Sequence, residues 1–289
     1  FFLIRIIRLV LNFPFTILIK FGNIYFRILR LFDPRKHDNF WPEEIDRNLK
    51  NFKSKKILIS KKNNISIQFY SSSKIAGYRI KTFFSKEPET LQWLDNNGAK
   101  NKVLFDIGAN MGVYSIYFAK KFDAQVFSFE PSYKNLEVLS KNVMLNFLHN
   151  NVKIISNPLC NNFTFSKFYQ NDFLPGEAKA RFIIKKNDLE EFSKNFNQKS
   201  NEVFYNTLGF SLDNLLEKKV INKPDLIKID VDGNELEIIK GAKNLLNNAN
   251  KLTILIEIRH DTKNQISEEL TKMGFHKILD FSDNEIWEK

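Results

Sequence analysis

The stretch VLFDIGANMGVYSIYFAK, Val103 to Lys120, constrains the fold of this 289-residue chain more than any other. An apolar run leads into a carboxylate, a turn with two glycines and a segment of helical periodicity. This is the order of a buried strand, a ligand-binding turn and a helix. Strand-like and helix-like segments continue to alternate after Lys120. The alternation predicts an α/β domain built around a mostly parallel sheet.

The same pattern predicts where each element lies. Strands are expected over residues 103–107, 125–130, 152–156, 226–231 and 252–258, with helices over 112–121, 133–147, 233–247 and 264–273. An antiparallel hairpin, 276–281 with 284–287, follows them. Upstream, KILIS and SIQFY alternate as two short strands, and Ser85 to Leu94 is expected to form a helix with Ser85 as N-cap.

Residues 157–222 interrupt the alternation and are too long for a simple connection. They contain three strand-like pieces (FTFSKFY, RFIIK and EVFYN), a Pro175-Gly176 turn and two short helical segments. Insertions of this kind often carry substrate recognition. We therefore expect three parts: a helical segment over 1–32, a cap or linker over 33–100, and a ligand-binding domain over 101–289 that contains the insertion.

The net charge of +11 is concentrated near the N-terminus. Residues 1–62 carry 14 Lys/Arg against 5 Asp/Glu, whereas the rest of the chain carries 30 against 28. This asymmetry predicts an anionic partner for the N-terminal segment, either a membrane surface or nucleic acid.

Residues 1–32 have the pattern of an amphipathic helix with a basic stripe. At about 100° per residue, the polar side occupies an arc of roughly 120° and consists of Arg5, Arg8, Asn12, Thr16, Lys20, Asn23, Arg27 and Arg30. The longest uncharged run, Leu9 to Ile19, is shorter than the about 20 residues that span a bilayer. We expect the segment to lie in the plane of an anionic membrane surface. The alternative is a helix packed on its own domain or on a dimer partner, and the wide apolar face disfavours nucleic acid.

The chain has one cysteine, Cys160, and four scattered histidines. This composition excludes a disulfide framework and a cysteine zinc site, and the histidines lack metal-ligand spacing. We expect no bound metal and a reducing compartment. The protein is therefore expected to be cytoplasmic and peripheral at the inner membrane face.

The glycine turn lacks the spacing of a phosphate-binding loop. Gly108 and Gly112 flank Asn110, unlike the G-x-G-x-x-G pattern of dinucleotide sites, and no Lys-Ser/Thr pair follows. Asp106, two residues before the first glycine, would repel a pyrophosphate and attract an ammonium group. S-adenosylmethionine offers an ammonium and a sulfonium and carries no phosphate.

Glu130 ends the second predicted strand, 18 residues after Gly112. An acid at this place suits hydrogen bonding to the two ribose hydroxyls, a feature that NAD sites share. Glu130 therefore indicates an adenosine ligand but does not distinguish S-adenosylmethionine from NAD.

Titratable residues recur at the ends of later strands. Asp230 ends the strand in PDLIKIDVDG, and Glu257 and His260 follow the strand in KLTILIEIRH. Ligands of open α/β sheets bind at this edge, so Asp230 would face the crevice of Asp106 if the first and fourth strands are neighbours. Methylation of a hydroxyl requires loss of its proton. The candidate bases are Asp230, Glu257 and His260.

Two further acids follow Asp230. Asp232 and Glu235 lie at the start of a predicted helix. A favourable interaction with the helix dipole therefore explains these acids as well as a role in the site does. A Mg²⁺ held by Asp230, Asp232 and Glu257 is an alternative to the metal-free site.

Together these segments resemble the FkbM family of S-adenosylmethionine-dependent methyltransferases. The matching pieces are EPETLQWL, FDIGANMGVYS, FSFEPS with Asn142 and Asn146 in the following helix, LIKIDVDGNELEIIKGA and ILIEI. The resemblance implies a class I methyltransferase fold, which is Rossmann-like with a seven-stranded, mostly parallel sheet and helices on both faces. It also implies O-methylation of sugars or other secondary metabolites. The chain departs from the family at Asp232, where the family has Glu.

The resemblance also implies site residues. The segments that bind the cofactor in the family contain Asp106, Gly108, Asn110, Gly112, Glu130, Pro131 and Ser132, and we add Asp230. We expect an O-methyltransferase that acts on a hydroxyl of a sugar, glycan or glycolipid precursor. The alternatives are an NAD(P)-dependent oxidoreductase, which the glycine spacing and Asp106 oppose, and a non-catalytic membrane adaptor with a relic methyltransferase fold.

Overall fold

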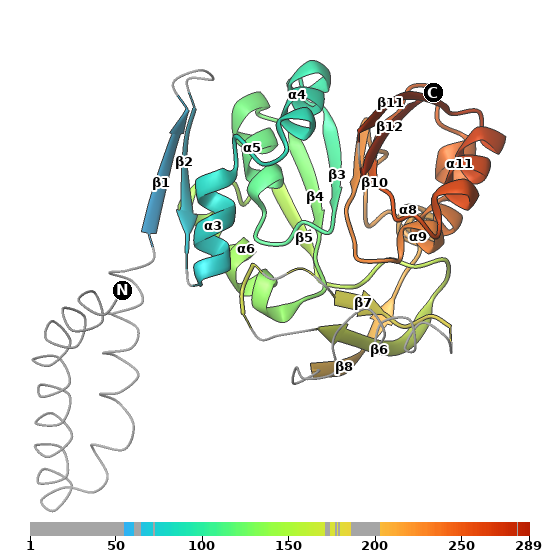
Figure 1. Ribbon diagram of the computed structural model, residues 1–289, viewed down its shortest axis with the longest axis horizontal. Coiled ribbons are helices and arrows are strands. Elements are labelled where there is room, and N and C mark those ends of the chain that lie inside the picture. The colour runs from blue at the N-terminus through green and yellow to red at the C-terminus, as the bar shows by residue number, and fades with distance from the viewer. Residues whose placement is uncertain are drawn as a thin grey trace, which may run out of the picture. The chain divides into compact units, whose positions relative to one another are not determined.

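The protein was analysed as a computed structural model that describes residues 55–60, 65–71, 73–170, 174–176, 178, 180–185, 203–281 and 283–289. Residues 54–289 belong to one compact unit built around a large central sheet (Figure 1). The predicted helix over 1–32 and residues 33–54 of the predicted cap or linker lie outside the described residues.

The central sheet has seven strands. They are β3 (Val103–Ile107), β4 (Gln125–Phe129), β5 (Val152–Ile155), β9 (Leu226–Ile229), β10 (Thr253–Glu257), β11 (His276–Phe281) and β12 (Asn284–Glu288). Their order is β11-β12-β10-β9-β3-β4-β5, and β12 alone runs in the direction opposite to the other six strands. This confirms the mostly parallel sheet and its C-terminal antiparallel hairpin. It also places the first and fourth predicted strands side by side, as β3 and β9.

Helices cover both faces of the sheet, as expected (Figure 1). One face carries α4 (Pro88–Asn97), α5 (Val113–Phe122) and α6 (Tyr133–Leu145), and the other carries α8 (Leu212–Glu217), α9 (Glu235–Gly241), α10 (Lys243–Asn247) and α11 (Lys263–Lys272). Strand β3 shows why two layers form, since Leu104 belongs to the first apolar core while Phe105 and Ile107 belong to the second. Burial of both faces accounts for the nearly continuous apolar runs in the sequence.

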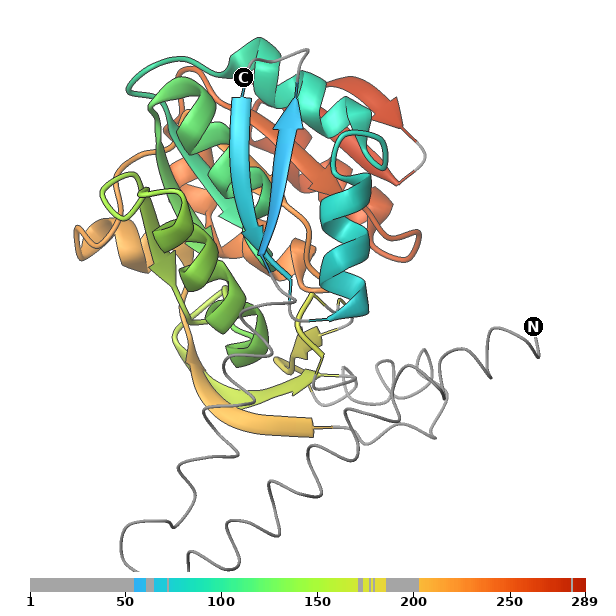
Figure 2. The same ribbon diagram turned by 90° about the vertical axis from the view of Figure 1, so that its left-hand side faces the viewer.

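The upstream strands form a hairpin, β1 (Lys55–Ser60) with β2 (Ile65–Tyr70), and β2 packs against α5 and α6 (Figure 2). Asn142 of α6 and Asn146, the C-cap of this helix, hold the edge of β2. Asn142 Oδ1 accepts the Tyr70 N–H at 2.6 Å, and the Asn146 side chain bonds both the N–H and the carbonyl of Gln68 at 3.0 and 2.7 Å. Within the described residues, every helix is too short or too polar to cross a bilayer.

The helix predicted from Ser85 begins later, at Pro88, and Ser85 does not cap it. The Ser85 hydroxyl instead donates to the Thr82 carbonyl. Proline disfavours helical backbone at the residue before it and suits the first helical position, so the helix starts at Pro88. A helix that we did not predict, α3 (Lys74–Thr82), precedes it and is capped by Ser73.

The helix predicted over 233–247 is two helices, α9 and α10. They separate at Ala242, whose φ of −109° and ψ of 13° depart from helical values. Gly241 lies against the insertion, where a Cβ would stand 2.1 Å from the Cys160 carbonyl oxygen. The remaining predicted elements of the sheet domain agree with the structure to within two residues at each end.

The insertion forms a second sheet at the carboxyl ends of the central strands (Figure 1). Its strands β6 (Thr164–Gln170), β7 (Ala180–Phe182) and β8 (Val203–Gly209) are antiparallel in the order β7-β6-β8. All three strand-like pieces of the sequence contribute to it. One of the two predicted short helices is α8, and the described residues of the insertion contain no second one.

Candidate active site

The turn between β3 and α5 lies directly against the end of β9. Gly108 has φ +81°, and a Cβ there would stand 1.9 Å from the Asp230 carbonyl oxygen. Only glycine combines this left-handed backbone with so close an approach. Asn110, also left-handed with φ 53°, orders the next residue because its Oδ1 accepts the Met111 N–H at 2.9 Å.

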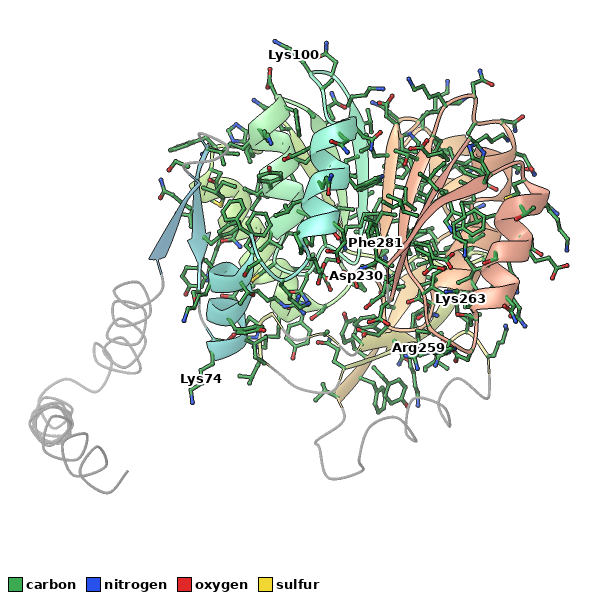
Figure 3. All side chains as sticks on the ribbon, turned by 45° about the horizontal axis from the view of Figure 1, so that its top comes forward. Lys74, Lys100, Asp230, Arg259, Lys263 and Phe281 are labelled. Atoms are coloured by element: carbon green, nitrogen blue, oxygen red, sulfur yellow. The ribbon has the colours of Figure 1, made fainter. Side chains whose placement is uncertain are left out.

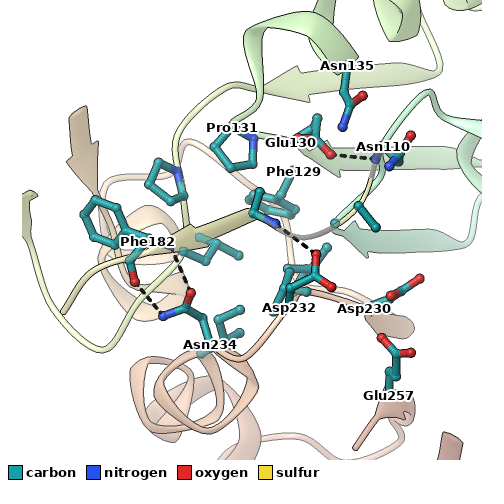
Figure 4. Close-up of a pocket in the computed structure, with 18 of the residues that line it drawn as sticks. Asn110, Phe129, Glu130, Pro131, Asn135, Phe182, Asp230, Asp232, Asn234 and Glu257 are labelled. Carbon is teal, nitrogen blue, oxygen red and sulfur yellow. Dashed lines mark hydrogen bonds between the residues drawn. The ribbon is translucent and has the colours of Figure 1, made fainter. Parts of the chain in front are cut away.

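A cavity opens beside this turn, at the carboxyl ends of β3, β4, β9 and β10 (Figure 4). Six predicted site residues line it: Gly108, Asn110, Glu130, Pro131, Asp230 and Glu257. Arg79, Lys86 and Glu87 contribute from the segment around α3 and α4, and Phe168, Ala180 and Phe182 contribute from the insertion. The cavity therefore joins three parts of the chain that are far apart in sequence.

Glu130 lies at the floor of this cavity and is buried. Its two carboxylate oxygens accept the backbone N–H groups of Asn110 at 2.7 Å and Ser132 at 2.8 Å. Burial raises the pKa of Glu130 to about 7, although these hydrogen bonds oppose the shift. Glu130 thus fixes the glycine turn to the end of β4, and lone pairs of its oxygens remain for a ligand.

Asp106 is not among the residues that line the cavity. Its side chain points under the sheet edge, is 1% exposed, and accepts the Ser115 hydroxyl at 2.5 Å. The other carboxylate oxygen lies 3.8 Å from the Lys228 ammonium. Strand alternation explains this orientation, because Asp106 shares the α5 face of β3 with Leu104.

Gly112 and Ser132 also fall outside the lining of the cavity. A Cβ on Gly112 would stand 2.3 Å from Leu139, so this glycine lets α5 pack on α6. Ser132 is the N-cap of α6, and its hydroxyl donates to Gln170 at 2.9 Å. Both residues support the walls of the cavity and do not face into it.

Lys228 is a residue that the sequence interpretation missed. It sits in the middle of β9, is 1% exposed, and donates to Asp230 Oδ2 at 2.8 Å. Its ammonium also lies 5.1 Å from the centre of the Tyr114 ring. Burial alone would lower the pKa of Lys228, but the charges of Asp230 and Asp106 raise it above its ordinary value. The sequence did contain a signal for this residue, a lysine within the apolar run LIKI. A buried lysine is almost always paired with an acid, which would have pointed to a polar site.

Asp230 and Glu257 face one another across the ends of β9 and β10 (Figure 4). Burial and the negative charge of Asp230 raise the pKa of Glu257 to about 9. Burial would also raise the pKa of Asp230, but the charge of Lys228 and a hydrogen bond from Glu257 lower it to about 2. At neutral pH the pair therefore holds one proton on Glu257 and one negative charge on Asp230.

The turn after β9 holds the insertion in place. Asp232 accepts the Ala180 N–H at 3.2 Å, and Asn234 bonds the N–H and carbonyl of Phe182 at 3.1 and 3.0 Å. Asp232 thus has a partner in β7 in addition to its place before a helix. Glu235 is buried and accepts the Gly233 N–H at 3.0 Å.

His260 does not reach the first cavity. It is exposed in the turn after β10 and lines a second, adjoining cavity together with Glu257. Of the three candidate bases, the structure therefore brings Asp230 and Glu257 together and leaves His260 apart. No group of three or more His, Cys, Asp or Glu side chains suited to a metal ion occurs among the described residues.

The first cavity fits an adenosine cofactor that has no phosphates. The carboxylate of Glu130 can accept ribose hydroxyls, and the apolar side chains of Ile107, Phe129 and Phe182 offer a wall for a flat ring. Asp230 adds a carboxylate that would repel a phosphate chain, whereas the Glu87 carboxylate is paired with Lys86 at 2.6 Å.

Comparisons with known proteins agree with this chemistry. The methyltransferase FkbM domain matches residues 106–284. Methyltransferase sdnD of Sordaria araneosa is 30% identical over 193 residues, which cover 61% of this chain and 73% of that protein. Hexuronic acid methyltransferase AglP of Haloferax volcanii is 24% identical over 204 residues, covering 65% and 73%.

Among solved structures, magnesium protoporphyrin IX methyltransferase of Synechocystis PCC 6803 with bound S-adenosylmethionine aligns with a TM-score of 0.42 and 13% identity, over 75% of this chain and 83% of that one. The match to the family model favours S-adenosylmethionine over the nicotinamide alternative. The chain belongs to the FkbM family of S-adenosylmethionine-dependent methyltransferases.

Proposed function

We propose that the protein methylates a hydroxyl group of a sugar, a glycan or a glycolipid precursor. The observation that carries this proposal is the Asp230–Glu257 pair, which lines the cofactor cavity with Lys228 donating to Asp230 at 2.8 Å. A hydroxyl needs a positioned acceptor for its proton when it is methylated. The relative AglP, a hexuronic acid methyltransferase, supports a sugar as the acceptor.

The proposed roles of the cavity residues follow from their positions. Glu130 and the turn at Gly108 and Asn110 would hold the adenosine part, while the insertion closes the cavity through Phe168 and Phe182. When bound, S-adenosylmethionine supplies an electrophilic methyl group on its sulfonium. Asp230 would orient the acceptor hydroxyl and take its proton.

Lys228 and Glu257 would act through Asp230. Their hydrogen bonds fix the orientation of its carboxylate and keep it ionised. Most of the rate enhancement would come from holding the hydroxyl in line with the sulfonium.

Transfer of a labelled methyl group from S-adenosylmethionine to a panel of sugars tests the proposal. We expect an alkali-stable methyl ether as product, because an ether survives where a methyl ester is hydrolysed. Asp230→Asn should lower kcat by about 10²-fold, the lower end of the range of a general base, because a carboxylate with a pKa of about 2 is a weak base. The variant should still bind S-adenosylhomocysteine. An alkali-labile product, or wild-type kcat in Asp230→Asn, would contradict O-methylation with Asp230 as base.

A further inference from the structure

A second cavity of about 400 Å³ adjoins the cofactor cavity on the side of β10. Val231, Asp232 and Glu257 line both cavities, so they share a wall. The rest of the second cavity is formed by the turn after β10, the start of α11 and the C-terminal hairpin. Glu257 belongs to this shared wall, so a molecule in the second cavity would lie next to the Asp230–Glu257 pair.

The lining of this cavity is strongly polar. Arg259 and Lys263 contribute positive charge, and the acids are Asp232, Glu257, Asp280, Asp283 and Glu285. Figure 3 labels Asp230, Arg259 and Lys263, which come from the ends of β9 and β10 and the start of α11. No Phe, Tyr or Trp is among the described residues of the lining. His260 adds an exposed imidazole, and the other side chains would recognise a ligand through hydrogen bonds and charge.

The positive charges of the lining are already paired. Lys263 contacts Asp280 at 3.1 Å and Glu285 at 3.2 Å, and Arg259 lies 3.8 Å from Asp261. Asp283 is exposed and has no partner among the described side chains. Lys277 also contacts Asp280 and Glu285, at 3.2 and 2.8 Å, and the raised pKa of Glu257 favours its neutral form. A ligand with its own carboxylate would thus meet chiefly the negative charge of Asp283, which disfavours its binding. Hydroxyls suit this wall because each can donate to a carboxylate and accept from a cation.

We propose that the second cavity is the acceptor site and that it takes a neutral, hydroxyl-rich sugar, with the reacting hydroxyl at Asp230. The inference rests on the proposed O-methyltransferase function. In the transfer, the hydroxyl oxygen forms a bond to the methyl carbon while the sulfur–carbon bond breaks. The electron pair stays on sulfur, and the hydroxyl proton passes to the Asp230 carboxylate.

Matched pairs of acceptors test the charge preference. The probes are methyl glycosides of glucose, galactose and mannose, each beside its C6 carboxylate analogue. We expect the neutral member of a methylated pair to have a kcat/KM about tenfold higher than the acid member. A higher kcat/KM for the acid member would overturn the inference.

A charge reversal tests the location of the site. Asp283→Lys should raise the relative kcat/KM of the acid member by about fivefold, chiefly through KM, which is the scale of a partly exposed charge pair. Glu217→Lys is the control, since Glu217 is exposed at the end of α8 and lines neither cavity. An unchanged preference in Asp283→Lys would place the acceptor elsewhere. A wild-type enzyme that binds S-adenosylhomocysteine but methylates none of these sugars would instead refute the proposed function.

Discussion

Glu257 couples the stability of the fold to pH. Its pKa is raised in the folded protein to about 9 from an ordinary value of 4.5. The folded state therefore keeps a proton that the unfolded chain releases, and stability decreases as pH rises through this interval. Asp230 acts in the opposite direction only under acid conditions, because its pKa is lowered to about 2.

Replacing Glu257 removes this contribution. We expect Glu257→Gln to reduce the fall in the free energy of unfolding between pH 5 and 9, measured by urea denaturation of the cofactor-free protein. Glu130 and Glu235, whose pKa values are raised by burial to about 7 and about 8, should keep part of the slope. Glu217→Gln removes an exposed carboxylate and serves as the control. A variant with the full wild-type slope would show that Glu257 is ionised at neutral pH.

Residues at strand ends were predictable from the sequence, because a parallel sheet gathers its carboxyl ends at one edge. Glu130, Asp230 and Glu257 were found in this way. The position of a residue at the end of a strand does not determine which way its side chain points, and Asp106, unlike these three, does not line the cavity. Arg79 was missed because α3 lies outside the strand–helix alternation.

At the scale of elements, the site depends on how closely the β3–α5 turn approaches β9. A side chain at Gly108 would meet both left-handed backbone strain and the carbonyl oxygen of Asp230. Gly274 has a similar φ of +85°, but a Cβ there would first meet the flexible end of Lys289 at 3.4 Å. Substitutions at the two glycines therefore distinguish the free-energy cost of left-handed backbone from the cost of the close contact with β9.

We expect Gly274→Ala to lower the free energy of unfolding by about 1 kcal/mol, the cost of left-handed backbone alone. Gly108→Ala should cost about 3 kcal/mol or more, because β9 must also move. Urea denaturation measures both values. Equal losses would mean that the turn and β9 are not in close contact.

The elements of the sheet domain were predictable because their periodicity is strong and their turns are short. The helix boundaries that were predicted wrongly depend on local backbone chemistry, as at Pro88, or on a tertiary contact, as at Gly241. The insertion was recognised as strand-rich. Its place over the cavity was not predictable, because it depends on Asp232 and Asn234 bonding to β7 across a long loop.

At the scale of the whole molecule, we propose that residues 1–32 bind an anionic membrane surface. Their basic stripe and wide apolar face support this, and such binding would bring the enzyme to a glycolipid precursor. We expect deletion of residues 1–32 to abolish co-sedimentation with liposomes that contain anionic lipid, while binding of S-adenosylhomocysteine persists. Equal co-sedimentation of the full and shortened chains would contradict the proposal.

We propose that the cavity beside the glycine turn holds the adenosine cofactor through Glu130. Calorimetric titration with S-adenosylhomocysteine tests it most directly. We predict saturable binding at one site per chain, weakened at least about tenfold in Glu130→Ala, the loss expected for charge-assisted hydrogen bonds, and unchanged in Glu217→Gln. No binding by the intact protein, or wild-type affinity in a folded Glu130→Ala variant, would contradict it.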